Sequence, residues 1–402
     1  MQQVMIFDGI RTPFGRHAGA LAPVRPDDLL AAVLRALIER NGIDSSLVED
    51  VIAGCSIQAG EDCRNVARNA ALLGGLDVSV GGVTVNRLCG SGAAAVLDAS
   101  RAIRTNEGDL FIAGGVESMS RAPWVMNKSE ATYDRAQTLY DSTIGWRFPN
   151  KELLRLYGDD SMPQTADNIA ADHAISREHS DEFAYRSQQK YAAARADGFF
   201  AEEILPVKVP TKSRKAAAVT VDQDEHPRPD TTLEKLRGLS SLFEGGVVTA
   251  GNASGINDGA AGLLLGSDAI GDKLGLRPRG RLVAGAIAGV QPRVMGLGPV
   301  PACHKALQRA GLALSDMDVI EINEAFATQV LGCLKLLQLE FGDARVNPNG
   351  GAISIGHPLG ASGARLVLTA LRQLEHSQGR YALVSMCIGM GQGIALVIER
   401  NA

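Results

Sequence analysis

The fold of this chain is decided by the stretch Val83-Thr84-Val85-Asn86-Arg87-Leu88-Cys89-Gly90-Ser91-Gly92-Ala93-Ala94-Ala95-Val96-Leu97. Its β-rich start, 83–85, predicts a short strand, and the alanine-rich run that continues to residue 103 predicts a buried helix. Cys89 is therefore expected on a tight turn between a strand and a helix. The glycines at 90 and 92 would let another molecule approach the backbone of this turn closely.

This turn gives Cys89 the surroundings of a reactive thiol. The free N–H groups and the positive end of the dipole of the following helix face the sulfur. They favour the thiolate, the form of cysteine that attacks carbonyl carbon. The alternative is an ordinary core residue, because free cysteine is among the most buried residue types. The stretch by itself leaves both interpretations open.

The composition is that of a globular protein with neither a nucleic acid nor a membrane as partner. The chain has 402 residues, 45% hydrophobic and 21% charged, which suffices for two or more domain-sized units. Its net charge of −5 is small, and the short basic run at 212–215 is expected to be a solvated loop. No apolar run is long enough to span a membrane, and no secretory signal is evident. We therefore expect a cytoplasmic protein.

The six cysteines, at 55, 63, 89, 303, 333 and 387, contain no C-x-x-C pair and form no cluster with histidine at ligand spacing. Reduced thiols are expected, as in cytosolic proteins. No metal site is expected, because structural zinc needs clustered Cys and His ligands.

Strands and helices alternate along the first part of the chain and again along the last part, which predicts the α/β class. Between these parts, from about 119 to 241, the sequence is rich in loops, with helices expected at 165–174 and 177–197. Such long loops tend to serve binding sites or subunit contacts. The expected strands are 4–7, 51–53, 83–85, 110–113, 282–284, 319–322, 382–386 and 394–398, and the expected helices of the first part are 27–40, 65–73 and 93–105.

The two α/β parts resemble repeats of one another. The segments 45–52 and 313–320 both place a short acidic connection before a Val-Ile strand, at an offset of 268 positions (319 − 51). The same offset carries Cys89 onto His357, in Gly356-His357-Pro358-Leu359-Gly360. Two similar halves packed about a pseudo-twofold axis would bring these turns together, so that a nucleophile would face a base.

Two further segments carry chemical groups at the ends of expected strands. In Cys387-Ile388-Gly389-Met390-Gly391-Gln392-Gly393 a strand enters a glycine-rich loop, whose exposed N–H groups suit an oxyanion site. A dinucleotide fingerprint is rejected, because these glycines precede a strand rather than a helix. Asn323 and Glu324 follow the strand that ends at residue 322, where ligand sites of α/β sheets lie. A helix N-cap is the alternative role for Asn323.

Together these segments closely resemble the signatures of the thiolase family, which here are C-G-S-G at 89–92, N-E-A-F at 323–326, G-H-P-L-G at 356–360 and C-I-G-M-G-Q-G at 387–393. The likeness covers nearly the whole chain. It implies an α/β thiolase fold, in which two similar βαβαβαββ halves stack as a five-layer αβαβα sandwich. The expected halves are residues 1–272, with an inserted loop domain at about 119–250, and residues 273–402.

The resemblance also implies the chemistry, which is transfer of an acyl group between coenzyme A (CoA) thioesters with a carbon–carbon bond cleaved or formed. By motif, Cys89 is the acylated nucleophile, His357 the base that activates it, and Cys387 the acid or base for the leaving carbon. Asn323, through a water, joins His357 in binding the thioester oxygen. The backbone N–H groups of Cys89 and Gly389 form a second oxyanion site. A 3-oxoacyl thioester needs such a nucleophile, such charge stabilisation and such a proton donor.

The same resemblance implies a CoA site and an assembly. No cofactor is expected to stay bound, because CoA and acyl-CoA are substrates. A homotetramer, formed as a dimer of dimers, is expected, with part of 121–160 as the tetramer loop. The CoA-binding residues that map by motif are Ser254, Arg228, Met162, Phe243, Ala325 and Phe326. Arg228 would pair with phosphate, and core packing is the alternative role for Met162 and Phe243.

Two segments, 60–70 and 141–148, look most like those of bacterial 3-oxoadipyl-CoA thiolases of aromatic-compound degradation. A distal carboxylate on such a substrate would need a cation, which Arg64, Arg135 or Arg147 would supply. Ala93 and Ser161 depart from the residues that are usual in relatives.

The rival functions are a broad acetyl-CoA acetyltransferase, a ketoacyl synthase and a non-catalytic acyl-CoA-binding scaffold. The synthase would use Cys-His-His, and the scaffold would lack a catalytic residue.

Overall fold

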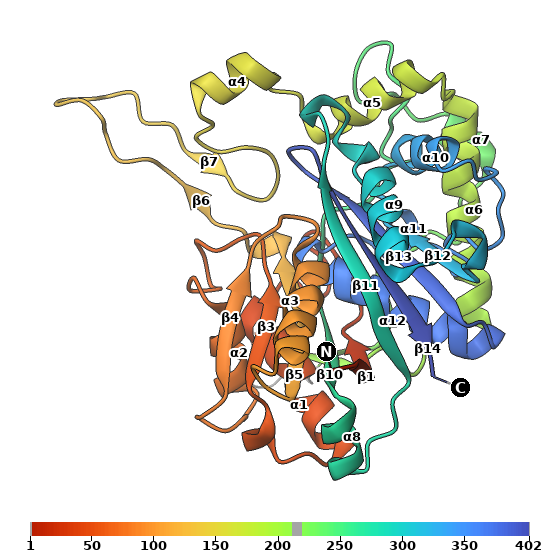
Figure 1. Cartoon of the computed structure of the whole chain (residues 1–402). Helices are drawn as coiled ribbons and strands as arrows, with labels where there is room; N and C mark the ends of the chain where they lie inside the picture. Colours follow the sequence, from red (N-terminus) through yellow and green to blue (C-terminus); the bar gives the residue numbers. More distant parts are fainter. Residues whose placement is uncertain (1, 211–218, 402) are drawn as a thin grey trace.

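One continuous mixed β-sheet runs through the molecule, and the computed structural model describes residues 2–210 and 219–401 (Figure 1). The predicted basic loop at 212–215 lies outside these residues. The strands of the sheet are β1 (Val4–Arg11), β2 (Gly15–Arg16), β3 (Asp50–Gly54), β4 (Gly81–Val85), β5 (Leu110–Ser118), β10 (Asn257–Ser267), β11 (Gly280–Gly289), β12 (Val319–Ile322), β13 (Tyr381–Ile388) and β14 (Gln392–Arg400). Hydrogen-bonded neighbours follow the order β12-β13-β14-β11-β1-β10-β5-β3-β4, with β2 paired to β10.

The strand pattern is repeated in the two halves of the sheet. In the first half, β3 is parallel to β4 and β5, β5 is antiparallel to β10, and β10 is antiparallel to β1. In the second half, β12 is parallel to β13, β13 is antiparallel to β14, and β14 is antiparallel to β11. The counterpart of β4 is reduced to a parallel bridge between Ile320 and Val346. The halves join where Met5 and Ile6 of β1 pair with β11.

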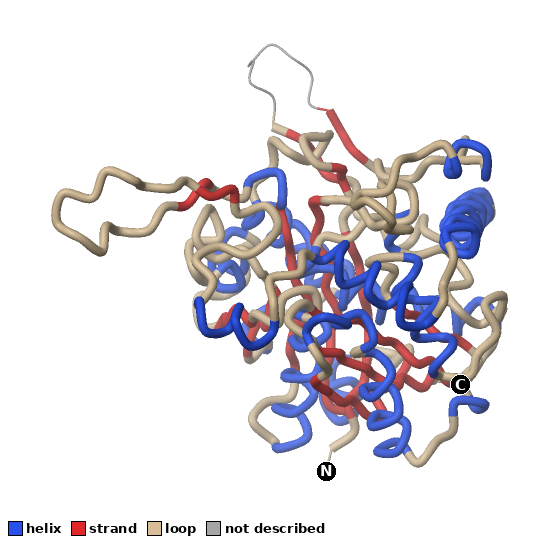
Figure 2. The backbone as a smooth tube through the Cα atoms, turned by 90° about the horizontal axis from the view of Figure 1, so that it is seen from above, coloured by secondary structure: helices blue, strands red, loops and turns tan. Residues whose placement is uncertain are grey.

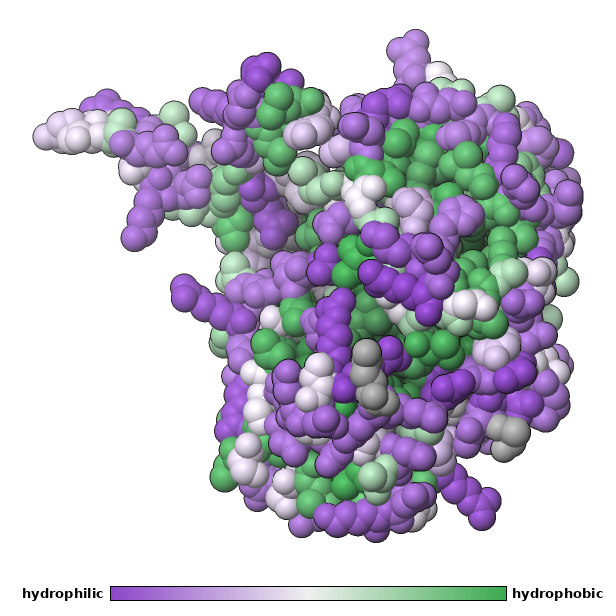
Figure 3. Space-filling model, in the orientation of Figure 1, coloured by the Kyte–Doolittle hydropathy of each residue, from purple (hydrophilic) through white to green (hydrophobic). Residues whose placement is uncertain are grey.

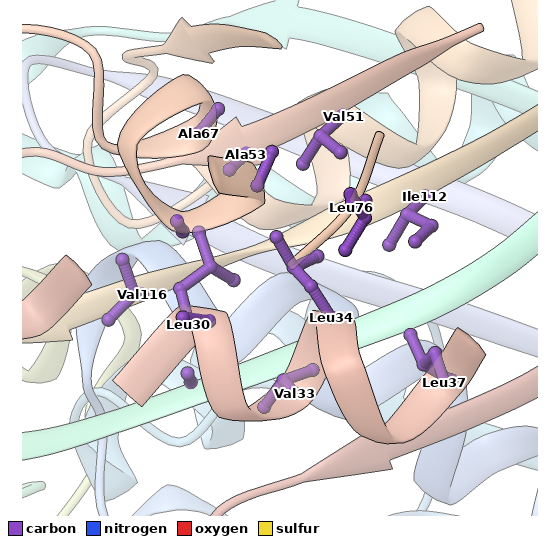
Figure 4. Close-up of a cluster of buried hydrophobic side chains, with 14 of the residues drawn as sticks. Leu30, Val33, Leu34, Leu37, Val51, Ala53, Ala67, Leu76, Ile112 and Val116 are labelled. Carbon is purple, nitrogen blue, oxygen red and sulfur yellow. The ribbon is translucent and has the colours of Figure 1, made fainter. Parts of the chain in front are cut away.

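Helices cover both halves of the sheet and also lie between them. α1 (Pro26–Asn41) and α2 (Val66–Leu73) cover the outer face of the first half, and α9 (Pro299–Ala310) and α10 (Ala327–Leu336) cover that of the second. α3 (Ser91–Thr105) and α12 (Leu359–Ser377) pack against each other and against strands of both halves. Figure 4 shows the outer core of the first half, where Leu30 and Leu34 of α1 lie near Val51 and Ile112 of the sheet. The predicted five layers are confirmed.

Glycines let the two middle helices touch through their backbones near their N-terminal ends. A Cβ added to Gly92 of α3 would lie 2.5 Å from the Gly360 carbonyl oxygen. A Cβ added to Gly363 of α12 would lie 2.2 Å from the backbone nitrogen of Ala93. Neither position has room for a side chain. The turns that precede α3 and α12 are therefore neighbours, as the sequence repeat predicts.

Between β5 and β10 the chain makes the predicted loop-rich insertion. Its long arm, with β6 (Trp124–Val125) and β7 (Tyr140–Asp141), projects from the body of the molecule in Figures 1 and 2, and Figure 3 shows mixed hydrophilic and hydrophobic residues on it. The insertion also contains α4 (Lys151–Tyr157), α5 (Met162–His173), α6 (Arg177–Ala196), β8 (Val207–Val209), β9 (Val219–Val221) and α7 (Leu233–Arg237). Ser176 caps α6 by accepting a hydrogen bond from His179 N, as predicted.

Two short helices, α8 (Asp268–Leu274) and α11 (Ala352–Ile355), complete the fold. Among the helices of the described ranges, none combines the length and the apolar character that a membrane span requires.

Candidate active site

Cys89 lies on a tight turn between β4 and α3, as predicted. The preceding residue, Leu88, has a φ of +47°, which few residues with a side chain adopt. The Asn86 side chain accepts a hydrogen bond from Leu88 N at 2.9 Å. Ser91 Oγ accepts from Arg87 N at 2.8 Å and donates to Leu88 O at 2.6 Å. These bonds hold the left-handed turn and fix Cys89 in front of the first turn of α3.

The thiolate predicted for Cys89 is wrong for the resting protein. Burial raises the pKa of the Cys89 thiol to about 11, although the N–H groups of Gly389 and of Cys89 itself donate toward the sulfur and oppose the rise. The loss of water around the sulfur therefore outweighs these donors and the dipole of α3. At neutral pH Cys89 is a thiol that needs a base.

A hairpin turn brings two more predicted residues to Cys89. Cys387 lies at the end of β13, and residues 389–391 turn directly into β14, with positive φ at Met390 (63°) and Gly391 (79°). A strand rather than a helix follows these glycines, so the rejection of a dinucleotide fingerprint is confirmed. Burial, and then the negative charge that Cys89 would carry as a thiolate, raise the pKa of Cys387 well above its usual value. Cys387 is thus a neutral thiol that can donate a proton.

His357 directly precedes Pro358, the N-cap residue of α12, and Ser362 orients its ring. The Ser362 hydroxyl donates to the Pro358 carbonyl oxygen at 2.9 Å and lies 2.7 Å from His357 Nδ1. Because the hydroxyl proton is already used, Nδ1 carries the imidazole hydrogen and donates to Ser362. His357 N also donates to Asn257 Oδ1 at 2.8 Å. His357 Nε2 is left unprotonated and able to accept a proton.

The imidazole of His357 is neutral at pH 7. Burial, and then the positive charge of Arg365, lower the pKa of His357 to about 3. Arg365 is itself fully buried, and its Nη1 lies 3.6 Å from Glu321 Oε2. A neutral imidazole with a free Nε2 suits the removal of a proton from a thiol during attack.

Asn323 lies at the carboxyl end of β12, as predicted. Its Nδ2 is 3.4 Å from His357 Nε2, and its backbone N donates to Ser385 O at 3.0 Å. α10 begins at Ala327 with Phe326 as its N-cap residue, so the alternative role of Asn323 as a helix cap is wrong. The side chains of Asn323 and His357 are neighbours in the buried site.

Comparisons with known proteins identify the family. Residues 4–269 match the family described as "Thiolase, N-terminal domain", and residues 276–400 match "Thiolase, C-terminal domain". The chain belongs to the thiolase family. It is therefore an acyltransferase enzyme, as its sequence predicts.

Full-length relatives of this thiolase include proteins whose names give their acyl-CoA substrates. The chain is 57% identical to the 3-oxoadipyl-CoA/3-oxo-5,6-dehydrosuberyl-CoA thiolase of Escherichia coli strain K12, and 58% identical to a beta-ketoadipyl-CoA thiolase of Acinetobacter baylyi, in each case over 402 residues and 100% of both chains. Among solved structures, the Bacillus anthracis acetyl-CoA acetyltransferase matches with a TM-score of 0.92 and the human mitochondrial 3-ketoacyl-CoA thiolase with 0.91. Each is 37% identical and covers 100% of this chain and 99% of its own.

Several of the residues predicted to contact CoA gather near Cys387 of this thiolase. Met162, at the start of α5, packs with Ala325, Phe326 and Cys387 in one apolar cluster. Ser254 adjoins this cluster, because its N–H donates to Ala325 O at 2.9 Å. These residues give the site an apolar wall beside the reactive thiols.

The two other predicted CoA-binding residues lie outside that cluster. The side chains of Phe243 and Arg228 are exposed. The backbone N of Arg228 donates to Gln188 Oε1 at 2.9 Å, which attaches its loop to α6. Within the described ranges, the His, Cys, Asp and Glu side chains form no group of three or more that could hold a metal ion.

Several residues that support the site were not among the predicted ones. Glu117, fully buried on β5, accepts hydrogen bonds from Gly360 N at 2.9 Å and from Ser56 N at 3.0 Å, and so holds the start of α12. An acidic residue inside an apolar strand was the signal available for it. Asn257 and Ser362 had no such signal, because their importance lies in contacts with His357.

Proposed function

We propose that the chain cleaves 3-oxoadipyl-CoA with CoA, giving succinyl-CoA and acetyl-CoA, through an acyl group carried on Cys89. The relative named for 3-oxoadipyl-CoA and 3-oxo-5,6-dehydrosuberyl-CoA is 57% identical to the chain over its full length, and one named for beta-ketoadipyl-CoA is 58% identical, whereas the acetyl-CoA acetyltransferase is 37% identical. The observation that carries the chemistry is the arrangement of Cys89 beside the Gly389 N–H and the buried Cys387 thiol.

In the first half-reaction, His357 Nε2 takes the proton of the Cys89 thiol as the sulfur attacks the keto carbon. The oxygen of the adduct accepts hydrogen bonds from the backbone N–H groups of Cys89 and Gly389. The bond between C2 and C3 of the substrate then breaks, and its electron pair forms the enolate of acetyl-CoA. Asn323, through a water, and His357 stabilise the enolate oxygen, and Cys387 donates a proton to its carbon. Acetyl-CoA leaves, and succinyl stays on Cys89.

In the second half-reaction, CoA takes the place of acetyl-CoA. Its thiol gives a proton to the Cys387 thiolate and attacks the succinyl carbonyl carbon. The bond to Cys89 breaks, and the Cys89 sulfur recovers its proton from His357. Succinyl-CoA leaves, and both thiols are restored. The reaction is reversible because each proton transfer and each bond change can also run in the opposite direction.

CoA is a substrate in this proposal, and no permanently bound cofactor takes part. Met162, Ala325, Phe326 and Phe243 would line the pantetheine, with Ser254 beside it. Arg228, whose side chain is exposed, would pair with a CoA phosphate. We also propose a homotetramer that uses the projecting arm, and a cytoplasmic location.

Steady-state thiolysis tests the substrate. The purified protein is assayed with 3-oxoadipyl-CoA and with acetoacetyl-CoA at saturating CoA. We expect the higher kcat/KM for 3-oxoadipyl-CoA, whereas a higher value for acetoacetyl-CoA would assign the chain to the broad acetyl-CoA acetyltransferases.

Alkylation tests the nucleophile. We expect iodoacetamide to label Cys89, and we expect 3-oxoadipyl-CoA without CoA to protect it by acylation. Exposed Cys63 is the internal control, because its labelling has no reason to respond to substrate. If mass spectrometry finds no substrate protection of Cys89, the assignment of Cys89 as the acylated nucleophile is wrong.

A further inference from the structure

The loop between β7 and α4 reaches the candidate active site through the tip of one side chain. Trp146 Cη2 lies 3.3 Å from the position that a Cβ on Gly389 would occupy. Leu88 Cδ1 at 3.2 Å and Met162 Sδ at 3.6 Å adjoin the same point. Gly389 is the residue whose N–H donates toward the Cys89 sulfur. The indole therefore forms part of the wall around the thioester that Cys89 would carry.

This wall defines where an acyl chain would run. An acyl group whose thioester oxygen lay at the Gly389 N–H would start beside Leu88, Met162 and Trp146, whose atoms are the nearest to a Cβ at Gly389. Trp146 is only partly covered by the protein, with 36% of its surface exposed, so its indole has apolar area left to cover a chain. A chain that ran along the indole would bring its far end toward the loop that carries Trp146.

Arg147, the next residue, provides a cation at this place. Its side chain is half-buried, and its Nη1 donates to the Gly145 carbonyl oxygen at 3.3 Å, which folds the guanidinium back over the loop that carries Trp146. Among residues 2–210 and 219–401, no carboxylate lies within ion-pair distance of Arg147. The loop is braced by an edge-to-face contact between Tyr140 and Phe148, whose ring centroids are 5.0 Å apart.

The other two arginines that the sequence suggested for this role are not adjacent to a residue that contacts Gly389. Arg135 lies on the projecting arm between β6 and β7 (Figure 1), in the stretch 126–139, and every residue of this stretch is exposed. Arg64 is exposed on the loop between β3 and α2. Arg87, which the sequence did not suggest for this role, is adjacent to Leu88 of the wall, but its Nη1 already donates to Gln392 Oε1 at 3.1 Å.

We infer that Arg147 is a specificity-determining residue that pairs with the distal carboxylate of a dicarboxylic 3-oxoacyl-CoA, with Trp146 covering the chain between that carboxylate and Cys89. The inference rests on the proposed function, since 3-oxoadipyl-CoA has such a carboxylate. A guanidinium suits this task, because its planar fork binds a carboxylate through two parallel hydrogen bonds.

The test compares two substrates of equal chain length, 3-oxoadipyl-CoA and 3-oxohexanoyl-CoA, which has a methyl group in place of the carboxylate. For Arg147→Gln, we expect the ratio of kcat/KM for the first substrate over the second to fall about 10- to 100-fold, the range of a lost charged hydrogen bond. Arg147→Lys keeps the charge without the fork and should give an intermediate ratio. Arg64→Gln and Arg135→Gln are the matched controls and should keep the wild-type ratio.

Each other outcome has a distinct meaning. If Arg147→Gln keeps the wild-type preference, or lowers kcat/KM equally for both substrates, Arg147 does not read the carboxylate and the inference fails while the proposed function stands. Loss of preference in Arg64→Gln or Arg135→Gln instead moves the role to that residue. A wild-type enzyme without preference for 3-oxoadipyl-CoA overturns the proposed function, and this inference with it.

Discussion

Replacing Gly363 by alanine should separate the two helices on which the site is built. The added Cβ would lie 2.2 Å from Ala93 N, 2.8 Å from Ala93 Cβ and 2.9 Å from Ala93 Cα. Ordinary contacts begin near 3.4 Å, so the backbones of α3 and α12 would have to move apart by up to 1.2 Å (3.4 − 2.2). A change of rotamer does not relieve this clash, because two of the three atoms belong to the backbone.

The magnitude follows from two opposing effects on stability. Overpacking of a core costs about 1–3 kcal/mol, and a clash with backbone belongs at the upper end. Alanine is better than glycine inside a helix by about 1 kcal/mol, which offsets part of that loss. We expect a net fall of about 2 kcal/mol in the free energy of unfolding. Activity should fall more, because a misplacement of about 1 Å between reacting groups costs about 10²-fold in rate.

Gly238→Ala is the matched control, since its added Cβ would meet only carbonyl oxygens at 3.5 Å. Guanidinium denaturation gives the free energy of unfolding, circular dichroism verifies the fold, and kcat of thiolysis gives the activity. The coupling of helix contact to catalysis would be refuted if Gly363→Ala were as stable and as active as Gly238→Ala.

Three further predictions concern the titrating groups of the site. Ser362→Ala removes the acceptor of His357 Nδ1, so kcat should fall about 10- to 100-fold at unchanged KM, with recovery in Ser362→Thr; a change in KM alone would contradict this positioning role. The alkylation rate of Cys89 should rise about tenfold per pH unit from about pH 7 to 9, because its pKa is about 11, and a plateau below pH 8 would show a preformed thiolate. The unfolded imidazole of His357 binds a proton near pH 6.5 and the folded one only near pH 3, so the protein should lose stability as the pH falls through this window. In acid denaturation, the free energy of unfolding of His357→Asn should fall less steeply with falling pH than that of the wild type. An equal slope for the two proteins would show that His357 is not the source of this pH dependence.

Much of the fold was predictable because its signals are local. The β-branched start at 83–85, the glycines after Cys89 and the alanine-rich run predict a strand, a turn and a helix without any distant contact. The repeat adds a long-range prediction, since α3 begins at Ser91 and α12 at Leu359, which differ by the same 268 positions as Val51 and Val319.

The candidate residues were also accessible from sequence, but their electrostatics were not. Cys89 was expected as a thiolate from the helix that follows it, whereas burial raises its pKa even though the Gly389 N–H opposes that rise. Desolvation depends on every segment that packs around a group, and those segments are hundreds of positions away in the chain. For the same reason Trp146 carried no signal in its own loop, since its importance comes from contact with Gly389.

The sequence by itself determined the order of strands and helices, the repeat of two halves and the thiolase signatures, because each of these is written in neighbouring residues or in their spacing. Only the tertiary structure decided which proton each group holds, which serine orients His357 and which side chains lie at Gly389. These properties depend on distances between segments remote in the chain, and such distances exist only after the two halves have packed around α3 and α12.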